Sequence, residues 1–236
     1  MARGKALMKI ILIILALIVA GFLVQTGIYV YKIKTGKITD ASFEKELTSS
    51  KNLSGAESAT PKTNEIINIT APSYGAADPK LTIIEFGNFA CPHSKEVSAA
   101  AREIMLKNKE TVKFIYRDFP LDDIYPSSSS LSLAGKCANE QNKFWAMHDK
   151  LYQASDVDIE TIANQIGLDY KIFSSCVSQK KYLSSIQKDF EDGYKNGVTG
   201  TPVFFFIKKG SENAPIKIPG AIPKATFEEI VKELLK

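Results

Sequence analysis

The pattern of hydrophobic and polar positions begins with a long apolar segment near the N-terminus. Residues 10–24 form an uninterrupted apolar run, and the mostly apolar stretch from Leu7 to Val30 is 24 residues long. A helix of this length crosses a hydrocarbon core of about 30 Å, so we expect residues 1–34 to form a membrane anchor. A signal peptide cleaved after Gly21 is the alternative, but the apolar run continues past that point.

A polar segment follows the apolar one. Residues 35–63 are rich in Ser, Thr, Lys and Glu and have little apolar periodicity. Such a segment cannot bury enough apolar surface to order itself, so we expect a flexible tether that leads to a domain over residues 64–236. Three basic residues on each side of the apolar run leave the positive-inside bias near zero. The short N-terminal tail favours a cytoplasmic N-terminus, so we expect a single-pass protein of the cell membrane whose domain is extracytoplasmic.

The pattern over residues 64–236 predicts an α/β domain. Short apolar runs predict strands over residues 64–70, 81–89, 111–117, 202–208 and 216–218. Residues 71–80 contain proline and glycine and predict a loop. Helical spacing of apolar residues predicts helices over residues 92–107 and 226–235 and a block of helices over about 127–195. Because a strand, a helix and a strand in this order form a right-handed βαβ unit, the helical block is an insertion into an α/β fold.

Composition and charge exclude several classes of function. The net charge of +4 arises from 30 basic and 26 acidic residues, and no basic stripe with interleaved aromatic residues occurs, so we expect no nucleic-acid partner. Two histidines give no convincing set of metal ligands, and no phosphate-binding loop occurs, so we expect neither a metal nor a cofactor. Three cysteines are an odd number, which suggests one pair and one free thiol.

One short motif contains the candidate chemistry. The sequence FACPHSKE places Cys91 and Pro92 after a predicted strand and at the start of a predicted helix. Proline is favoured at the first helical position, and the unpaired N–H groups and dipole of a helix N-terminus favour a thiolate there. His93 adds a hydrogen-bond donor or a positive charge, whereas Ser94 stands where a dithiol site would have its second cysteine. A small buried hydrophobic residue is the alternative role for Cys91.

Three segments, IIEFGNFACPHS, KFWAMHDKLY and GVTGTPVFFF, occur in an order that resembles the DsbA-like thiol–disulfide oxidoreductase family. The resemblance covers residues 64–236 and implies a thioredoxin fold with a helical insertion, in which CPHS replaces a dithiol CxxC site. It also implies that Pro202 follows a cis peptide bond and faces Cys91. Thr201 would then offer backbone hydrogen bonds to a bound peptide.

The resemblance implies roles for three further residues. Glu85 would be a buried acid that moves protons beneath the active cysteine; the alternatives are a solvent-facing edge residue or an ion pair with Lys113 or Lys95. Cys137 and Cys176 would form a structural disulfide, and two unpaired cysteines in helix cores are the alternative. A disulfide agrees with an exported domain, since such bonds persist in oxidising compartments.

A single active thiol limits the chemistry. Cys91 can attack a disulfide and form a mixed disulfide, but the hydroxyl of Ser94 cannot resolve it. We therefore expect a thiol–disulfide exchange protein of monothiol type, an isomerase or reductase that assists disulfide-bond formation and protein folding. Its partners would be cysteine-containing exported proteins, together with a thiol reductant or a membrane redox partner. The alternatives are a redox-inactive binding or chaperone module and an introduced serine that traps partners.

Overall fold

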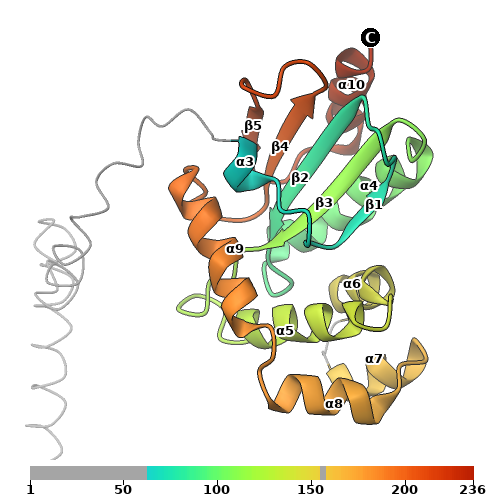
Figure 1. Ribbon diagram of the computed structural model, residues 1–236, viewed down its shortest axis with the longest axis vertical. Helices are drawn as coiled ribbons and strands as arrows, with labels where there is room; N and C mark the ends of the chain where they lie inside the picture. The colour runs from blue at the N-terminus through green and yellow to red at the C-terminus, as the bar shows by residue number, and fades with distance from the viewer. Residues whose placement is uncertain (1–62, 155–157) are drawn as a thin grey trace, which may run out of the picture. The chain divides into compact units, whose positions relative to one another are not determined.

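A five-stranded mixed sheet forms the centre of the domain, and the computed structural model describes residues 63–154 and 158–236 (Figure 1). The membrane anchor expected over residues 1–34 lies outside the described residues. The tether expected over residues 35–63 also lies outside them, except for its last residue. Among the residues described, no helix has both the length and the apolar character needed to span a membrane.

The sheet has the longest apolar runs at its centre. The strand order is β1-β3-β2-β4-β5, in which β2 and β3 are parallel and the other neighbouring pairs are antiparallel. The strands are β1 (Ser73–Gly75), β2 (Leu81–Gly87), β3 (Val112–Asp118), β4 (Val203–Lys208) and β5 (Ile216–Pro219). Strands β2 and β3 are buried on both faces, which explains why their sequences are nearly continuous apolar runs and do not alternate.

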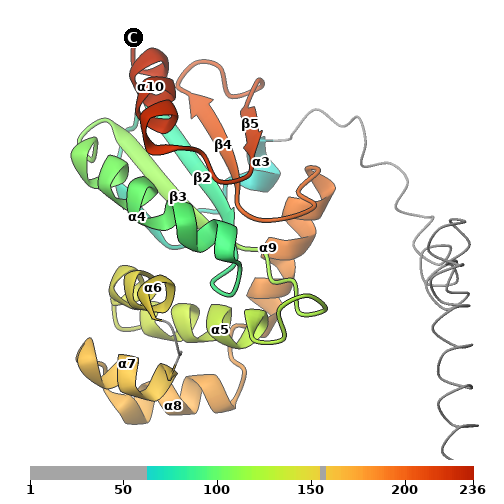
Figure 2. The same cartoon turned by 180° about the vertical axis from the view of Figure 1, so that it is seen from behind.

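Helices cover both faces of the sheet (Figures 1 and 2). The helices of these two layers are α3 (Thr63–Ile66), α4 (Pro92–Lys107), α9 (Leu183–Lys195) and α10 (Lys224–Leu234). On the face covered by α4 and α10, Ile83 of the sheet and Phe227 of α10 belong to one buried apolar cluster. On the other face α9 approaches the sheet closely at Gly193, because a Cβ there would lie 2.9 Å from the ring of Phe86.

The helical insertion has an apolar core of its own. Its helices are α5 (Ser128–Asn139), α6 (Phe144–Gln153), α7 (Ile159–Gln165) and α8 (Tyr170–Ser178), followed by the first part of α9. The core includes the buried residues Phe144, Met147, Ile162, Phe173 and Ile186. The prediction of an α/β domain with a helical block over about residues 127–195 is confirmed.

The first predicted strand is wrong. Residues 64–70 contain most of the short helix α3 and a turn, whereas β1 lies within residues 71–80, which were predicted to be a loop. In the turn, the side-chain oxygen of Asn68 accepts hydrogen bonds from the backbone N–H and the hydroxyl of Thr70, at 3.0 and 2.7 Å. Local side-chain bonds of this kind compete with strand pairing. Strand β1 has only three residues, too few to give a periodic signal.

An ionic cluster of five buried side chains joins the sheet to the insertion; its members are Arg117, Asp118, Lys136, Asp189 and Asp192. Arg117, near the end of β3, forms ion pairs with two carboxylates of α9, with Asp189 at 2.6 Å and with Asp192 at 2.7 Å. Lys136 of α5 lies 2.8 Å from Asp189 and 3.2 Å from Asp118. The ionic cluster therefore connects the end of β3 to the insertion's first helix and to its last.

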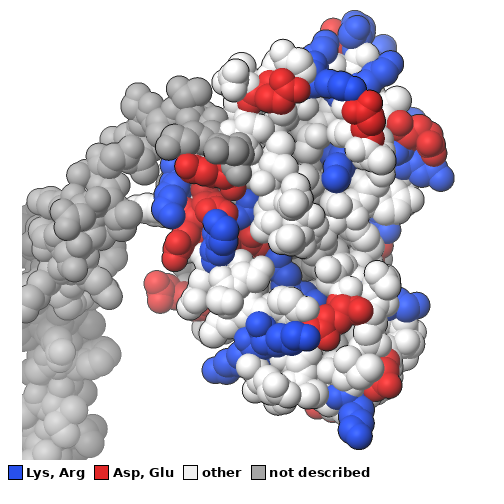
Figure 3. All heavy atoms as spheres, in the orientation of Figure 1, with Lys and Arg blue, Asp and Glu red and all other residues white. Residues whose placement is uncertain are grey.

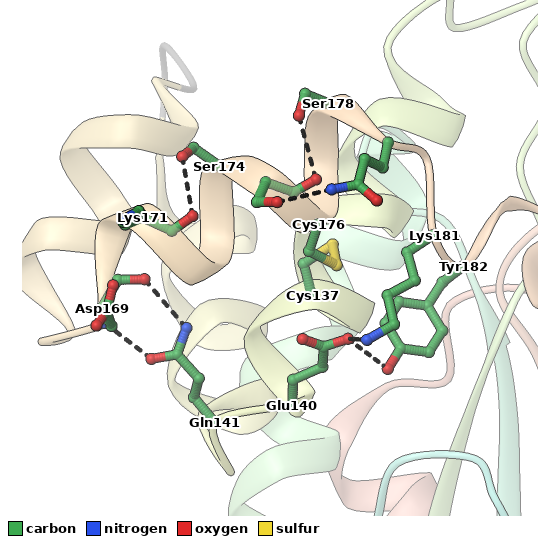
Figure 4. Close-up of a disulfide and its surroundings, with 12 residues drawn as sticks. Cys137, Glu140, Gln141, Asp169, Lys171, Ser174, Cys176, Ser178, Lys181 and Tyr182 are labelled. Atoms are coloured by element: carbon green, nitrogen blue, oxygen red, sulfur yellow. Dashed lines mark hydrogen bonds and ion pairs between the residues drawn. A yellow bond between two sulfur atoms is a disulfide. The ribbon is translucent and has the colours of Figure 1, made fainter.

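A disulfide joins two helices of the insertion (Figure 4). The sulfur atoms of Cys137 in α5 and Cys176 in α8 are 2.03 Å apart, and the Cα atoms are 5.8 Å apart. Nearby, the Glu140 carboxylate pairs with the ammonium of Lys181 and accepts a hydrogen bond from the Tyr182 hydroxyl at 2.7 Å. Two kinds of contact, covalent and ionic, thus connect α5 to the segment around the end of α8.

We expect the double replacement of Cys137 and Cys176 by alanine to lower the free energy of unfolding of the full chain by about 4 kcal/mol. The two cysteines are 39 residues apart in sequence, and closing a loop of that size restricts the unfolded chain. Equilibrium unfolding in urea measures the difference. The wild-type chain in excess reductant is the control and should unfold like the variant. Equal stability of the oxidised wild type and the variant would contradict the expectation.

Candidate active site

The end of the central strand positions Cys91. After β2, residues 88–90 form a short turn in which the backbone N–H of Cys91 donates to the carbonyl of Asn88 at 3.0 Å. Cys91 is the N-cap residue of α4, with φ −82° and ψ 124°, and Pro92 occupies the first helical turn. Proline suits this place because its missing N–H would be unpaired there in any residue. The thiol therefore lies at the N-terminus of a 16-residue helix.

A second segment reaches the thiol from the neighbouring strand. The Cys91 Sγ donates a hydrogen bond to the carbonyl oxygen of Thr201 at 3.3 Å. The Thr201–Pro202 peptide bond is cis and directly precedes β4, which is antiparallel to β2. The sheet thus brings together two residues that are 110 positions apart in sequence. Only 4% of Cys91 is exposed.

The two residues that follow Pro92 have opposite environments. The side chain of His93 is 68% exposed, and its Nδ1 lies 3.8 Å from the carboxylate of Glu96. Ser94 is fully buried, and its Oγ accepts a long hydrogen bond of 3.4 Å from the backbone N–H of Asn88. The hydroxyl at the position of a second cysteine is therefore directed into the protein, whereas the histidine is directed to solvent.

Glu85 lies below this helix, in the middle of the sheet. It is paired in register with Tyr116 of β3 and Phe204 of β4, and only 1% of it is exposed. Its Oε1 has no hydrogen-bond partner among the described residues. Burial raises the pKa of this carboxyl to about 8. The alternative of a solvent-facing edge residue is therefore wrong.

Two buried tyrosines complete a polar group around Glu85. The hydroxyls of Tyr116 and Tyr152 are 2.9 Å apart, and Tyr152 also hydrogen-bonds with Ser94. Burial raises the pKa of both phenols well above their usual value, and the charge of Glu85 raises it further. We call Glu85, Ser94, Tyr116 and Tyr152 the buried polar cluster. It places groups that hold protons at neutral pH beneath the N-terminus of α4.

Sequence reasoning missed two residues beside the thiol. Tyr125 lines the same hollow of the surface as Cys91, and the pKa of its hydroxyl is raised by partial desolvation, then by the charge of the Cys91 sulfur and by a hydrogen bond to it. The Asn88 side chain is buried, accepts from the N–H of Ala90 at 3.0 Å and donates to Ser128 at 3.0 Å. Both follow the carboxyl ends of the parallel strands β2 and β3, where functional loops meet in α/β sheets.

A small apolar groove opens beside the thiol. Its volume is about 370 Å³, and we call it the Cys91 groove. Besides Cys91, it is lined mainly by Phe89, Pro92, Tyr125, Pro126, Leu131 and Leu151. Within residues 63–154 and 158–236, no group of three or more His, Cys, Asp or Glu side chains is arranged to hold a metal ion. The site therefore offers one nucleophilic sulfur, a backbone acceptor and an apolar contact surface.

The chain matches one protein family and parts of several curated proteins. A family model described as thioredoxin matches residues 67–217. A Na⁺/H⁺ antiporter, NhaA 3 of Salinispora tropica, is 29% identical over 135 residues, which are 56% of this chain and 21% of the antiporter. The chain thus spans about a fifth of that relative's length. "Probable disulfide bond formation protein D" of Bacillus anthracis is 28% identical over 151 residues, 56% of this chain and 68% of that protein.

Solved structures share the fold. The thiol-disulfide exchange protein alpha-DsbA2 of Wolbachia pipientis is 20% identical, with a TM-score of 0.62 over 72% of this chain and 90% of the other. A periplasmic thioredoxin-like protein of Salmonella enterica serovar Typhimurium is 26% identical, with a TM-score of 0.58 over 76% of this chain and 98% of the other.

Proposed function

The chain belongs to the thioredoxin family, and from that premise we propose that it acts as the DsbA-like thiol–disulfide oxidoreductases do and exchanges disulfides through Cys91 alone. One observation carries the proposal. Cys91 caps a helix with its sulfur 3.3 Å from the Thr201 carbonyl, while the position of a resolving cysteine is held by the buried Ser94. The nucleophile is therefore in place and the internal resolving step is missing.

The proposed reaction has two exchange steps. The Cys91 thiolate attacks one sulfur of a client disulfide; a new S–S bond forms to Cys91, and the other client sulfur leaves as a thiolate. A second thiolate then attacks the mixed disulfide and releases Cys91. When that thiolate belongs to the client, the disulfide is isomerised without net oxidation. When a reductant supplies two thiols, the client disulfide is reduced and the reductant is oxidised.

Groups around Cys91 have distinct proposed roles. Tyr125 donates its hydroxyl hydrogen to the sulfur when the sulfur is a thiolate. The backbone at Thr201 and Pro202 binds an extended client chain beside the sulfur. His93, exposed next to Pro92, offers a hydrogen-bond donor to the bound client.

Glu85 is the proposed proton store of the site. Its pKa of about 8 means that it retains a proton at neutral pH. Together with Tyr116 and Tyr152 it lies beneath the helix that begins at Cys91, and the buried polar cluster reaches that helix at Ser94. We assign it the transfer of a proton to and from the thiolates that form during exchange.

The proposed protein is anchored in the membrane and acts on exported proteins. Residues 1–34 anchor the chain in the cell membrane, residues 35–63 are the tether, and residues 64–236 act outside the cytoplasm. The apolar run of residues 10–24 and the similarity to a periplasmic thioredoxin-like protein support this placement. The clients are cysteine-containing exported proteins, and a thiol reductant or a membrane redox partner restores Cys91. The activity assists disulfide-bond formation and folding.

A redox-inactive binding module is the second candidate. The low exposure of Cys91 and the missing thiol at Ser94 favour it, because both reduce the capacity for turnover. In this case the Cys91 groove would bind client chains without a covalent step. The two candidates differ in what happens when the sulfur is removed.

Removal of the thiol should abolish exchange. The reduced full chain, in substoichiometric amount, is mixed with a test protein whose disulfides are scrambled, and recovery of the native test protein is followed together with acid-quenched mixed disulfides. We expect the wild type and the control Ser98→Ala to accelerate recovery and to form mixed disulfides, and Cys91→Ala to do neither. Recovery with Cys91→Ala equal to that of the wild type would overturn the exchange proposal in favour of the binding module.

A further inference from the structure

A second groove adjoins the Cys91 groove. It lies between the loop after β3 and helix α9, has a volume of about 720 Å³, and we call it the α9 groove. Its apolar lining includes Leu121, Leu183, Ile186 and Phe190. Ile124 lines both grooves. The two grooves therefore meet at one side chain, and the sulfur of Cys91 lines one of them.

Ile124 is an exposed apolar residue on an ordered turn. The residue is 65% exposed, so its apolar side chain is available to a partner. The turn is fixed because the N–H groups of Ile124 and Tyr125 donate to the carbonyl of Leu121, at 3.0 and 2.8 Å. Asp122 fixes the other end by accepting from the N–H of Ser129 at 2.9 Å. The apolar contact is thus preformed, which lowers the entropy lost on binding.

The rim of the α9 groove is acidic. Of the described residues that line it, Asp122, Asp123 and Glu191 are acidic and none is basic. On the face that shows α9, uncharged surface lies between side chains of both signs (Figure 3). A partner that fits this groove has a large apolar side chain and a lysine or arginine close to it.

We propose that the two grooves form one docking surface for an extended client polypeptide joined to Cys91. A large apolar residue next to the client cysteine occupies the Cys91 groove. A second apolar residue, followed by a basic one, crosses Ile124 and occupies the α9 groove. This inference rests on the proposed function and names the class of client it selects. A tripeptide-sized thiol could fill only the Cys91 groove.

The test uses chromogenic peptide disulfides and the full chain. Each peptide has one cysteine, linked to the coloured thiol 2-nitro-5-thiobenzoate. When the Cys91 thiolate attacks the peptide sulfur, the peptide becomes bonded to Cys91 and the coloured thiolate leaves, so absorbance gives the rate. One peptide has leucine beside the cysteine and a Leu-Lys pair further along; the other has serine and Ser-Glu at the same places. The symmetric disulfide of the coloured thiol is the reference, because it has no peptide to dock.

We expect the apolar, basic peptide to react roughly tenfold faster than the polar, acidic one, relative to the reference disulfide. Ile124→Ser should remove most of this preference, and Asp123→Asn should reduce the part that depends on lysine. The control Ile172→Ser changes an isoleucine of α8 that is 49% exposed and remote from both grooves, and it should keep the preference.

The outcomes separate the two proposals. If the reference disulfide and both peptides fail to react, the exchange function itself is wrong. Reaction with all three probes, but with no preference between the peptides or with a preference that Ile124→Ser retains, overturns the docking surface and leaves exchange intact. A further peptide with leucine beside the cysteine but Ser-Glu further along separates the grooves; if it reacts as fast as the apolar, basic peptide, only the Cys91 groove is used and the docking surface is overturned.

Discussion

Replacing Glu85 by glutamine is expected to raise the free energy of unfolding by about 3 kcal/mol at pH 7 and about 4 kcal/mol at pH 8, with little effect at pH 4. The cause is the burial of a carboxyl in the centre of the sheet, which raises its pKa to about 8. Glutamine has the shape of the protonated acid but never becomes charged. Urea unfolding of the full chain at several pH values gives the difference directly.

The direction follows from the proton balance of the two states. Folded Glu85 retains its proton up to about pH 8, whereas in the unfolded chain it loses the proton near 4.5. Between these values the folded state binds more protons, so the stability of the wild type falls as pH rises. Below pH 4.5 both states are protonated, and the contribution of the neutral carboxyl is fully present. Above pH 8 that contribution is lost.

A matched exposed acid is the control for this measurement. Glu110 has an 86% exposed side chain, and Glu110→Gln should change stability little at any pH. A difference between wild type and Glu85→Gln that is the same at pH 4 and pH 8 would show that the carboxyl is not protonated by burial. Slower exchange in a more stable Glu85→Gln variant would agree with a functional carboxyl retained at a cost in stability.

Replacing Ser94 by cysteine is expected to convert the site into a stoichiometric oxidant. Cys91 caps α4 and residue 94 lies in its first turn. Helix geometry places Cα atoms three residues apart at about 5 Å, which is within the range of about 4.4–6.8 Å that a disulfide spans. The oxidised variant should then form one disulfide in a reduced test protein per molecule, as its own disulfide becomes two thiols. Mass spectrometry of both proteins counts the transferred disulfides.

Ser98→Cys is the matched control, since it adds a thiol to the same helix one turn further along. Ser98 is mostly buried, but it is seven residues from Cys91 and should form no bond with it. A folded Ser94→Cys variant whose two thiols remain reduced in oxidised glutathione would contradict the geometry proposed for the first turn. If Ser94→Cys and Ser98→Cys transferred equal numbers of disulfides, residue 94 would be no better placed than residue 98 to form a bond with Cys91.

The overall fold could be predicted from the sequence where a local pattern is strong. Strands β2 and β3 are long apolar runs, and the proline after Cys91 marks the start of α4, so these elements were predicted within two residues. Membership of the thioredoxin family and the thioredoxin-like fold with a helical insertion are confirmed. Strand β1 was missed because three residues paired at an edge give no periodicity, while Asn68 forms a turn in the segment predicted instead.

The surroundings of the thiol could be predicted only in part. The sequence indicated Cys91, Thr201 and Glu85, because each belongs to a recognisable motif or strand. Tyr125 lies in a loop with no motif, and its contact with the sulfur depends on how the loop after β3 folds back. Tyr152 reaches Tyr116 across 36 residues of sequence, and this contact exists only after α6 packs on the sheet. Contacts of this kind depend on tertiary packing and leave no local pattern.

The ionic cluster at the end of β3 has a consequence for how the sequence can evolve. Because Arg117, Lys136, Asp189 and Asp192 of this cluster are buried and pair with one another, loss of one leaves an uncompensated charge and costs about 3–5 kcal/mol. That is a large part of the stability of an ordinary domain. We therefore expect substitutions here to be tolerated only when several occur together. We also expect that exchanging the helical insertion for that of another protein, without changing the sheet, would separate these charges and destabilise the domain.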